Sequence, residues 1–257
     1  MSVSTADVAK LRARTGVGVL DAKNALEEAK GNEEQAIEIL RKKGIAQAVK
    51  KAARVQTQGA IFIAATDAKA ALVQIRCETD FVERSDVFIK FGQDLADKLL
   101  SQGKAGFDAY ASEKVPAAVL ELGENISIGE TREVAAPIIG TYVHSNRKIG
   151  VIAGLEGGTK EQALDTAMHC AAMNPPYLRP SDVSQETVLK EREIWKEQLS
   201  KEKKPPEIIE KIMLGKERKF KEENALLTQP FVKDPAKTVE KMLGTAKLKD
   251  CVRVSFA

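Results

Sequence analysis

Apolar positions along residues 1–54 repeat at intervals close to 3.6 residues, the period of an α-helix. The pattern breaks at residues 15–18 (TGVG) and at Gly31-Asn32, where glycine can end a helix and Asn32 can cap the next one. Three short helices are therefore predicted, forming a small N-terminal bundle with a basic linker helix. Such a unit buries little core of its own and can offer a face to a partner. The periodic positions are Val8, Leu11, Val19, Ala22, Ala25, Leu26, Ala29, Ala36, Ile37, Leu40 and Ile45.

The pattern changes to short apolar runs from Gly59 onward. Two such runs, residues 59–66 and 71–77, flank a turn and predict a β-hairpin. An amphipathic helix is predicted next, because Phe88, Phe91, Leu95 and Leu99 fall on one helical face. A pair of helices at residues 105–122 and a strand at residues 125–135 are expected after it.

The same order of elements then recurs. A second hairpin is predicted at residues 138–144 and 149–155, a helix at residues 160–173 and a last short strand at residues 251–256. Two hairpin-plus-helix units in series indicate an α+β core with two similar halves. The expected domains are the bundle at 1–54, a core N-subdomain at 55–137, and a core C-subdomain at 138–180 and 225–257.

Residues 181–224 form a highly charged insertion in the second half. They contain 11 acidic and 11 basic residues, with apolar residues at helical spacing and Pro205-Pro206 in the middle. This pattern predicts an antiparallel helical hairpin that projects from the core. Two interpretations stay open for its narrow apolar seam: a solvated arm, or a contact with a partner, including a homodimer formed through the hairpin. The apolar positions are Val188, Trp195, Leu199, Ile208, Ile212 and Met213.

Composition narrows the classes of function. The net charge is only +3 and aromatic residues make up 5% of the chain, which argues against a general nucleic-acid coat protein or a base-stacking platform. Six basic residues and no acidic one lie between Arg41 and Arg54. A solvated helical linker is one interpretation of this run, and nucleic-acid or partner contact by an RNA-binding or ribosome-associated adaptor is the other.

Sequence signals for a compartment all favour a reduced, cytoplasmic protein. The three cysteines, Cys77, Cys170 and Cys251, are far apart in sequence, so neither a disulfide framework nor a zinc site is expected. The N-terminal residues lack the apolar stretch of a secretory signal. No apolar run is long enough to span a bilayer, and no membrane partner is expected.

The chain carries little sign of covalent chemistry. His169 lies on an apolar helix and is best interpreted as a core histidine, whereas His144 ends a strand before a turn and could be exposed. Neither residues 15–18 nor residues 157–160 complete a phosphate-binding loop, and Thr159 is better explained as a helix N-cap. We therefore expect no catalytic residue, no metal site and no cofactor. A small-molecule enzyme would need a deep pocket lined by perturbed acids or His144.

Residues 77–84 (CETDFVER) stand out, because they join a predicted strand to a predicted helix. Asp80 can cap that helix, with Glu83 completing a capping box. Phe81 would then lie at the first helical turn, on a corner of the fold. Two interpretations stay open: the ring inserts into an apolar pocket of another protein, or it packs onto the core of its own helix near Phe88.

Residues spread over nearly the whole chain resemble the elongation factor Ts family. No single motif suffices, but together the segments follow the order of the family. In the first part they are residues 11–18 (LRARTGVG), Asp21, Lys23, Ala25-Leu26, and residues 40–44, 50–52 and 78–82. In the second part they are residues 123–126, 142–144, 149–151, 167–169 and 229–232.

The resemblance implies a guanine-nucleotide exchange factor for elongation factor Tu. Such a factor binds elongation factor Tu in its GDP-bound and nucleotide-free forms, disturbs its magnesium and phosphate site, and promotes GDP release during translation elongation. It acts by binding and not as an enzyme, and direct nucleic-acid binding is not expected. In this family the N-terminal bundle is of the ubiquitin-associated type, and the charged insertion corresponds to a helical protrusion.

The resemblance also implies which residues contact the partner. Phe81 would insert between two helices of elongation factor Tu, and His144 would press nearby from the second half of the core. The segment associated with displacing the magnesium ion consists of Thr79, Asp80, Phe81 and Val82. The matching contact positions of the N-terminal bundle are Arg12, Val19 and Leu20.

Overall fold

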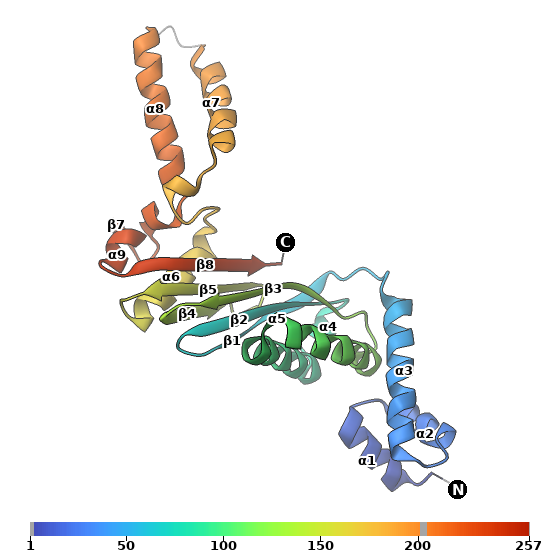
Figure 1. Ribbon diagram of the computed structural model, residues 1–257. Coiled ribbons are helices and arrows are strands. Elements are labelled where there is room, and N and C mark those ends of the chain that lie inside the picture. Colours follow the sequence, from blue (N-terminus) through green and yellow to red (C-terminus); the bar gives the residue numbers. More distant parts are fainter. Residues whose placement is uncertain (1–2, 201–204, 257) are drawn as a thin grey trace. The chain divides into compact units, whose positions relative to one another are not determined.

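The computed structural model describes residues 3–200 and 205–256 (Figure 1). Helices and antiparallel strands are both present, which confirms the predicted α+β class. Residues 201–204 of the predicted helical insertion lie outside the described residues. The chain forms two compact units, the first with residues 3–133, 143–150 and 254–256 and the second with residues 134–142 and 151–253. In the described ranges no helix has the length and apolar character that crossing a membrane requires.

The N-terminal bundle has three helices, as predicted. The Ser4 hydroxyl caps the first by accepting a hydrogen bond from the Asp7 backbone at 3.1 Å, and Gly16 ends it with φ 73°. The Asn32 side chain caps the third by accepting from the Gln35 backbone at 3.0 Å, which confirms its predicted role. The helices are α1 (Thr5–Thr15), α2 (Val19–Glu28) and α3 (Glu33–Lys51).

The first sheet contains the predicted hairpin. Strands β1 (Gln58–Ala65) and β2 (Lys69–Cys77) pair antiparallel with Phe62 opposite Val73, and β3 (Ser127–Ala135) completes the order β1-β2-β3. The long helix α5 (Asp86–Leu122) packs against β1 and β2 (Figure 1). Phe62 and Phe88 meet in this core with ring centroids 6.0 Å apart, and both are fully buried.

The predicted pair of helices at residues 105–122 is wrong. After a kink at Gly103 (φ 65°, ψ −174°), a single helical segment continues to Leu122 with Pro116 inside it. Its apolar side chains lie on one face and pack into the core, so a second break would have exposed part of that face. The buried ones are Phe107, Ala111, Ala118 and Val119.

The second sheet has the order β4 (Ile138–Val143), β5 (Ile149–Glu156) and β8 (Lys247–Ser255). Its last strand starts at Lys247 and not at residue 251 as predicted, because Leu248 is buried between the exposed Lys247 and Lys249 and so extends the alternation. Helix α6 (Lys160–Met173) matches the predicted range, and the Thr159 side chain caps it.

His169 on α6 is a core histidine, as predicted. Its side chain is fully buried, its Nε2 lies 3.0 Å from Gln229 Oε1, and its Nδ1 accepts a hydrogen bond from the Val232 backbone at 3.2 Å. The imidazole thereby joins α6 to a set of short elements near the end of the chain. These are η2 (Leu226–Thr228), β6 (Pro230–Phe231), β7 (Asp234–Thr238) and α9 (Val239–Leu243).

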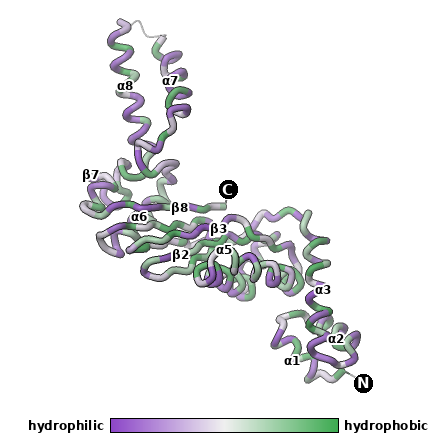
Figure 2. Tube along the Cα trace, in the orientation of Figure 1, coloured by the Kyte–Doolittle hydropathy of each residue, from purple (hydrophilic) through white to green (hydrophobic). Residues whose placement is uncertain are grey.

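Two helices form the predicted charged arm, α7 (Gln185–Ser200) and α8 (Pro206–Glu223), which follow the short helix η1 (Pro180–Asp182). They pack side by side, and both are mostly hydrophilic with separated hydrophobic positions (Figure 2). Trp195, Leu199 and Met213 are buried between them. Ile208, which was predicted for the same seam, is 48% exposed. It lies in the first turn of α8, before the part of that helix whose side chains belong to the buried cluster.

Candidate functional site

The corner between β2 and α5 is built around one carboxylate, that of Glu124. Its Oε2 accepts hydrogen bonds from the backbone N–H groups of Glu78 and Thr79 at 2.9 and 3.0 Å. Its Oε1 accepts from the Thr79 hydroxyl at 2.5 Å. Glu78 in turn accepts from the Asn125 backbone at 2.6 Å. The chain therefore leaves the sheet along a fixed path before α4 (Asp80–Glu83) begins.

The capping box predicted for Asp80 and Glu83 is wrong. Thr79 is the N-cap of α4, and its side chain accepts a hydrogen bond from the Val82 backbone at 3.4 Å. Asp80 is the first helical residue and forms an ion pair with Arg84 at 3.0 Å. Glu83 contacts Lys148 instead, as described below. The reason is that the Thr79 hydroxyl already occupies the capping position, one residue before the predicted cap.

Phe81 points into solvent from this corner. Its side chain is 84% exposed, whereas the neighbouring Val82 packs against the core. The interpretation of Phe81 as packed onto its own helix is therefore wrong, and Phe88 alone occupies that position in the core. The structure thus presents a large apolar ring on a corner braced by hydrogen bonds, an arrangement that suits an interface anchor.

The turn that carries His144 belongs to the same compact unit as this corner. His144 is exposed, and its backbone N–H donates to Ile149 O at 2.9 Å while its carbonyl accepts from Arg147 N at 2.7 Å. Arg147 adopts a positive φ of 55°, and its carbonyl accepts from Ile61 N at 2.9 Å. The turn is therefore well defined, and it is docked on β1.

An ion pair joins this turn to α4. Lys148 Nζ lies 2.6 Å from Glu83 Oε2, and the two side chains are only 26% and 12% exposed. A hollow of about 350 Å³ lies over this pair, with walls from α4 and from residues 145–148. Phe81 and His144 are thus carried by two segments that are directly connected.

The other predicted contact residues lie on the N-terminal bundle. Arg12 lies in the last turn of α1, and its Nε donates to Val17 O at 3.2 Å, which ties α1 to the loop before α2. Val19 and Leu20 begin α2, and both are more than half exposed. Arg12 and Val19 line a hollow of about 400 Å³ on this surface. These residues therefore form a second exposed patch, apolar at Val19 and Leu20 and charged at Arg12, built on different elements from the α4 corner.

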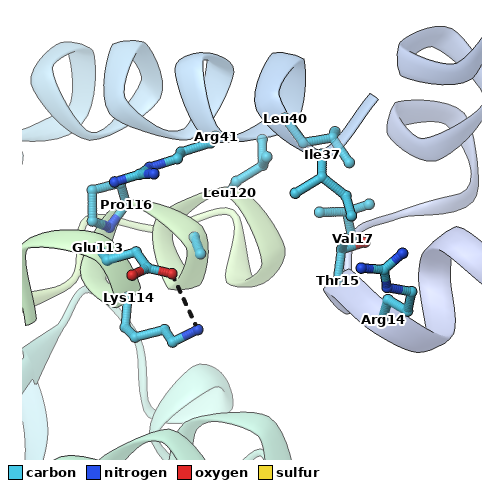
Figure 3. A pocket seen from close by; sticks show the side chains of 11 residues that line it. Arg14, Thr15, Val17, Ile37, Leu40, Arg41, Glu113, Lys114, Pro116 and Leu120 are labelled. Carbon is cyan, nitrogen blue, oxygen red and sulfur yellow. Dashed lines mark hydrogen bonds and ion pairs between the residues drawn. The ribbon is translucent and has the colours of Figure 1, made fainter. Parts of the chain in front are cut away.

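A further hollow lies where α3 faces the C-terminal part of α5 (Figure 3). Its volume is about 190 Å³, and its walls include Leu40 and Arg41 of α3 and Pro116 and Leu120 of α5. The Glu113–Lys114 pair at its edge is 3.5 Å long. Every predicted site residue lies outside this hollow.

The Cys77 thiol near the corner is poorly suited to act as a nucleophile. Burial, with the Glu124 carboxylate nearby, raises the pKa of the Cys77 thiol to about 12, and the thiol donates to Thr79 O at 3.3 Å. Burial lowers the pKa of His169, far along the chain. Among residues 3–200 and 205–256 no three His, Cys, Asp or Glu side chains are grouped to hold a metal ion.

Half of the basic run between Arg41 and Arg54 is engaged with carboxylates of the same chain. The Lys42–Glu38 distance is 2.8 Å, the Arg54–Glu78 distance is 3.4 Å, and Lys43 forms an ion pair with Asp21. Lys51 donates to Gly123 O at 2.7 Å. These contacts favour the linker interpretation over a phosphate-binding strip.

Sequence reasoning missed the residues that brace the site. Glu124 lies 46 and 45 positions from the two backbone groups it binds, and Lys148 lies 65 positions from Glu83. No local spacing links such residues. The sequence offered one signal: two carboxylates, Glu78 and Glu83, lie on either side of Phe81. This spacing suggests that both carboxylates have charged or polar partners, but it does not say which residues those partners are.

Comparison with known proteins places these features in a family context. The model of the family described as elongation factor TS matches residues 78–256, which include the α4 corner and the His144 turn. A protein named elongation factor Ts from Hydrogenovibrio crunogenus is 43% identical, over 99% of this chain and 91% of its own length. Proteins of the same name from Marinobacter nauticus and Aeromonas salmonicida are 40% and 43% identical, over 95% and 94% of this chain and 87% and 86% of their own lengths.

Proposed function

Since this chain belongs to the elongation factor Ts family, we propose that it is a guanine-nucleotide exchange factor that binds elongation factor Tu and promotes GDP release in translation elongation. The observation that carries the proposal is the exposed ring of Phe81 on a braced corner. The contact residues proposed at the corner and the turn are Thr79, Asp80, Phe81, Val82 and His144.

The proposed mechanism needs binding energy and no catalytic proton. GDP is held largely through its phosphates, by a magnesium ion and by backbone N–H groups of the partner. Moving the helices that support this site would spoil the near-octahedral coordination that magnesium demands. The factor acts if it binds the nucleotide-free state more tightly than the GDP-bound state, because only that difference shifts the equilibrium.

One aromatic ring cannot supply the whole difference. Burying a Phe side chain contributes roughly 1.5–3 kcal/mol, and each 1.4 kcal/mol weakens nucleotide binding about tenfold. A second surface must therefore contribute, and the exposed patch with Arg12, Val19 and Leu20 is the one we propose. The homodimer through the helical arm stays a prediction.

The test is the release of a fluorescent GDP analogue from elongation factor Tu. Wild-type chain is expected to accelerate release, and Phe81→Ala to reduce the acceleration by about 10- to 100-fold, as the loss of roughly 1.5–3 kcal/mol implies. Thermal stability should change by no more than about 0.5 kcal/mol, since the ring is exposed.

Two variants make the result specific. Leu214→Ala removes another exposed apolar side chain, on the charged arm, and controls for general loss of apolar surface. Phe88→Ala removes a fully buried ring and shows what a structural defect looks like, with a loss of about 3–5 kcal/mol. No acceleration by the wild-type chain would refute the proposed function.

A further inference from the structure

The ammonium group of Lys148 is fully engaged between three segments of the fold. A lysine side chain has three N–H donors. The Nζ atom of Lys148 donates to Glu83 Oε2 at 2.6 Å, to Gly59 O at 2.7 Å and to Gln58 Oε1 at 3.2 Å. One side chain thus connects the His144 turn, the start of β1 and helix α4.

Backbone and ring contacts hold Lys148 where it can make these bonds. Its carbonyl accepts a hydrogen bond from Phe256 N at 2.9 Å, and its Nζ lies 5.0 Å from the centroid of the Phe256 ring. Its own N–H donates to Asn146 Oδ1 at 3.0 Å. The lysine is therefore fixed at both its backbone and its charged end.

The Glu83 carboxylate is also held by more than one contact. It is the last residue of α4, and its Oε2 also accepts from the Gly59 backbone at 3.4 Å. Gly59 has φ 146°, and a Cβ there would overlap the Ile75 carbonyl oxygen of β2, so glycine is required at this position of β1. The carboxylate and the ammonium are both largely buried, where an ion pair is screened less than on the surface.

We propose that the Glu83–Lys148 ion pair is a positioning device for nucleotide exchange, which holds the Phe81 helix and the His144 turn at a fixed spacing. The inference rests on the proposed function, because the spacing matters only if both side chains press on one partner. Neither Glu83 nor Lys148 needs to touch that partner. Each acts through the exposed residue on its own segment, Phe81 two positions before Glu83 and His144 four positions before Lys148.

A fixed spacing between α4 and the His144 turn matters because the binding energy from both segments has to stabilise the nucleotide-free state of the partner. If α4 and the turn could move independently, ordering them would consume part of that energy. Misplacing an interacting group by about 1 Å can cost on the order of 100-fold in rate. Loss of the ion pair should therefore lower the maximal rate of GDP release more than it weakens the association.

The experiment compares Lys148→Met, Glu83→Gln and the double variant with wild type. GDP release from elongation factor Tu is measured over a range of chain concentrations. Each single variant is expected to lower the maximal release rate about tenfold or more, while the half-saturating concentration changes little. The double variant should be no worse than the poorer single one, since both remove the same interaction.

A matched control is the Lys69–Glu133 pair. Its length is 2.8 Å and its side chains are 37% and 31% exposed, and it lies in the same compact unit, away from α4. Lys69→Met should leave the release kinetics unchanged. A loss equal to that of Lys148→Met would mean that any half-buried ion pair has the same effect, and would overturn the assignment.

A second readout uses the isolated chain and needs no partner. Lys148→Met should speed hydrogen exchange at the backbone N–H groups of His144 and Arg147, and Lys69→Met should not. Wild-type release kinetics together with unchanged exchange in Lys148→Met would overturn the positioning role alone. An inactive wild-type chain would overturn the proposed function itself, so the two failures are distinguishable.

Discussion

Phe81, Val82 and Glu83 are consecutive residues with three different surroundings. Phe81 faces water, Val82 packs against the core, and Glu83 contacts Lys148. Successive residues of a helix point about 100° apart, so a single turn can anchor itself, pair with a neighbouring segment and present a ring to a partner. The short length of α4 is therefore no obstacle to holding Phe81 firmly.

The buried His169 gives stability a pH dependence with a defined sign. Burial disfavours the charged imidazolium and lowers the folded-state pKa below the ordinary value of about 6.5. As the pH falls below about 6.5, the unfolded chain takes up a proton that the folded chain does not. The free energy of unfolding should therefore decrease from about pH 6.5 downward, until the folded-state pKa is reached.

The measurement is denaturant unfolding across this pH range. His169→Asn keeps an acceptor for the Val232 N–H, loses the contact with Gln229, and should cost about 1–3 kcal/mol at neutral pH. Its profile should be flatter than that of wild type below pH 6.5. An unchanged slope in His169→Asn would show that other groups produce the dependence.

At the scale of elements, the charged arm depends on a small apolar seam. Trp195 and Phe220 meet with ring centroids 5.8 Å apart, and Arg192 contacts Glu217 at 2.9 Å and Glu210 at 3.2 Å. The Glu210 side chain is 61% exposed, and an exposed ion pair contributes about 0–1 kcal/mol. The Arg192–Glu217 pair is more buried, with side chains 28% and 19% exposed. The arm is therefore held by its few buried apolar side chains together with this one partly buried ion pair.

The arm is expected to unfold before the rest of the chain. Trp195 is the only tryptophan, so its fluorescence reports on the arm, while far-UV circular dichroism reports on all helices and strands. Leu199→Ala creates a cavity beside Trp195 that costs about 2–5 kcal/mol. It should lower the midpoint of the fluorescence transition and leave the main circular dichroism transition in place.

The control is Leu189→Ala, which removes a half-exposed leucine of the same helix. It should shift neither transition by much, as surface substitutions usually change stability by about 0.5 kcal/mol or less. If Leu199→Ala moved both transitions together, the arm and the remainder would be one cooperative unit.

At the scale of the whole molecule, the proposed exchange activity must be reciprocal. If the chain lowers the affinity of elongation factor Tu for GDP by some factor, GDP must lower the affinity for the chain by the same factor. We expect equal factors from two titrations, fluorescent GDP with and without the chain, and calorimetry of the chain with and without GDP. Phe81→Ala should reduce both factors equally.

Unequal factors would contradict a single linked equilibrium. They would mean that one of the titrations does not follow the ternary complex, and that the chain accelerates release by another route.

A salt series adds a discriminating control. Because the net charge is only +3 and half of the basic run is engaged internally, the affinity for elongation factor Tu should fall less steeply with salt than that of a phosphate-binding protein.

The fold was more predictable from the sequence than the contacts that hold the α4 corner and the His144 turn, because those contacts join residues far apart in the chain. The helices of the bundle, the two hairpins and the exposure of His144 all followed from local patterns. The partner of Glu83 did not, and neither did the helix cap, which moved from Asp80 to Thr79 because Glu124 had already fixed the chain there.

By itself the sequence determined where several helices begin, because caps such as Asn32 and Thr159 act on backbone groups only a few positions away. It also determined that residues 77–84 form a corner. Only the tertiary structure decided that Phe81 faces water and that Glu83 pairs with Lys148. The physical reason is that burial and ion pairing depend on which elements pack together, and packing joins residues that the chain keeps far apart.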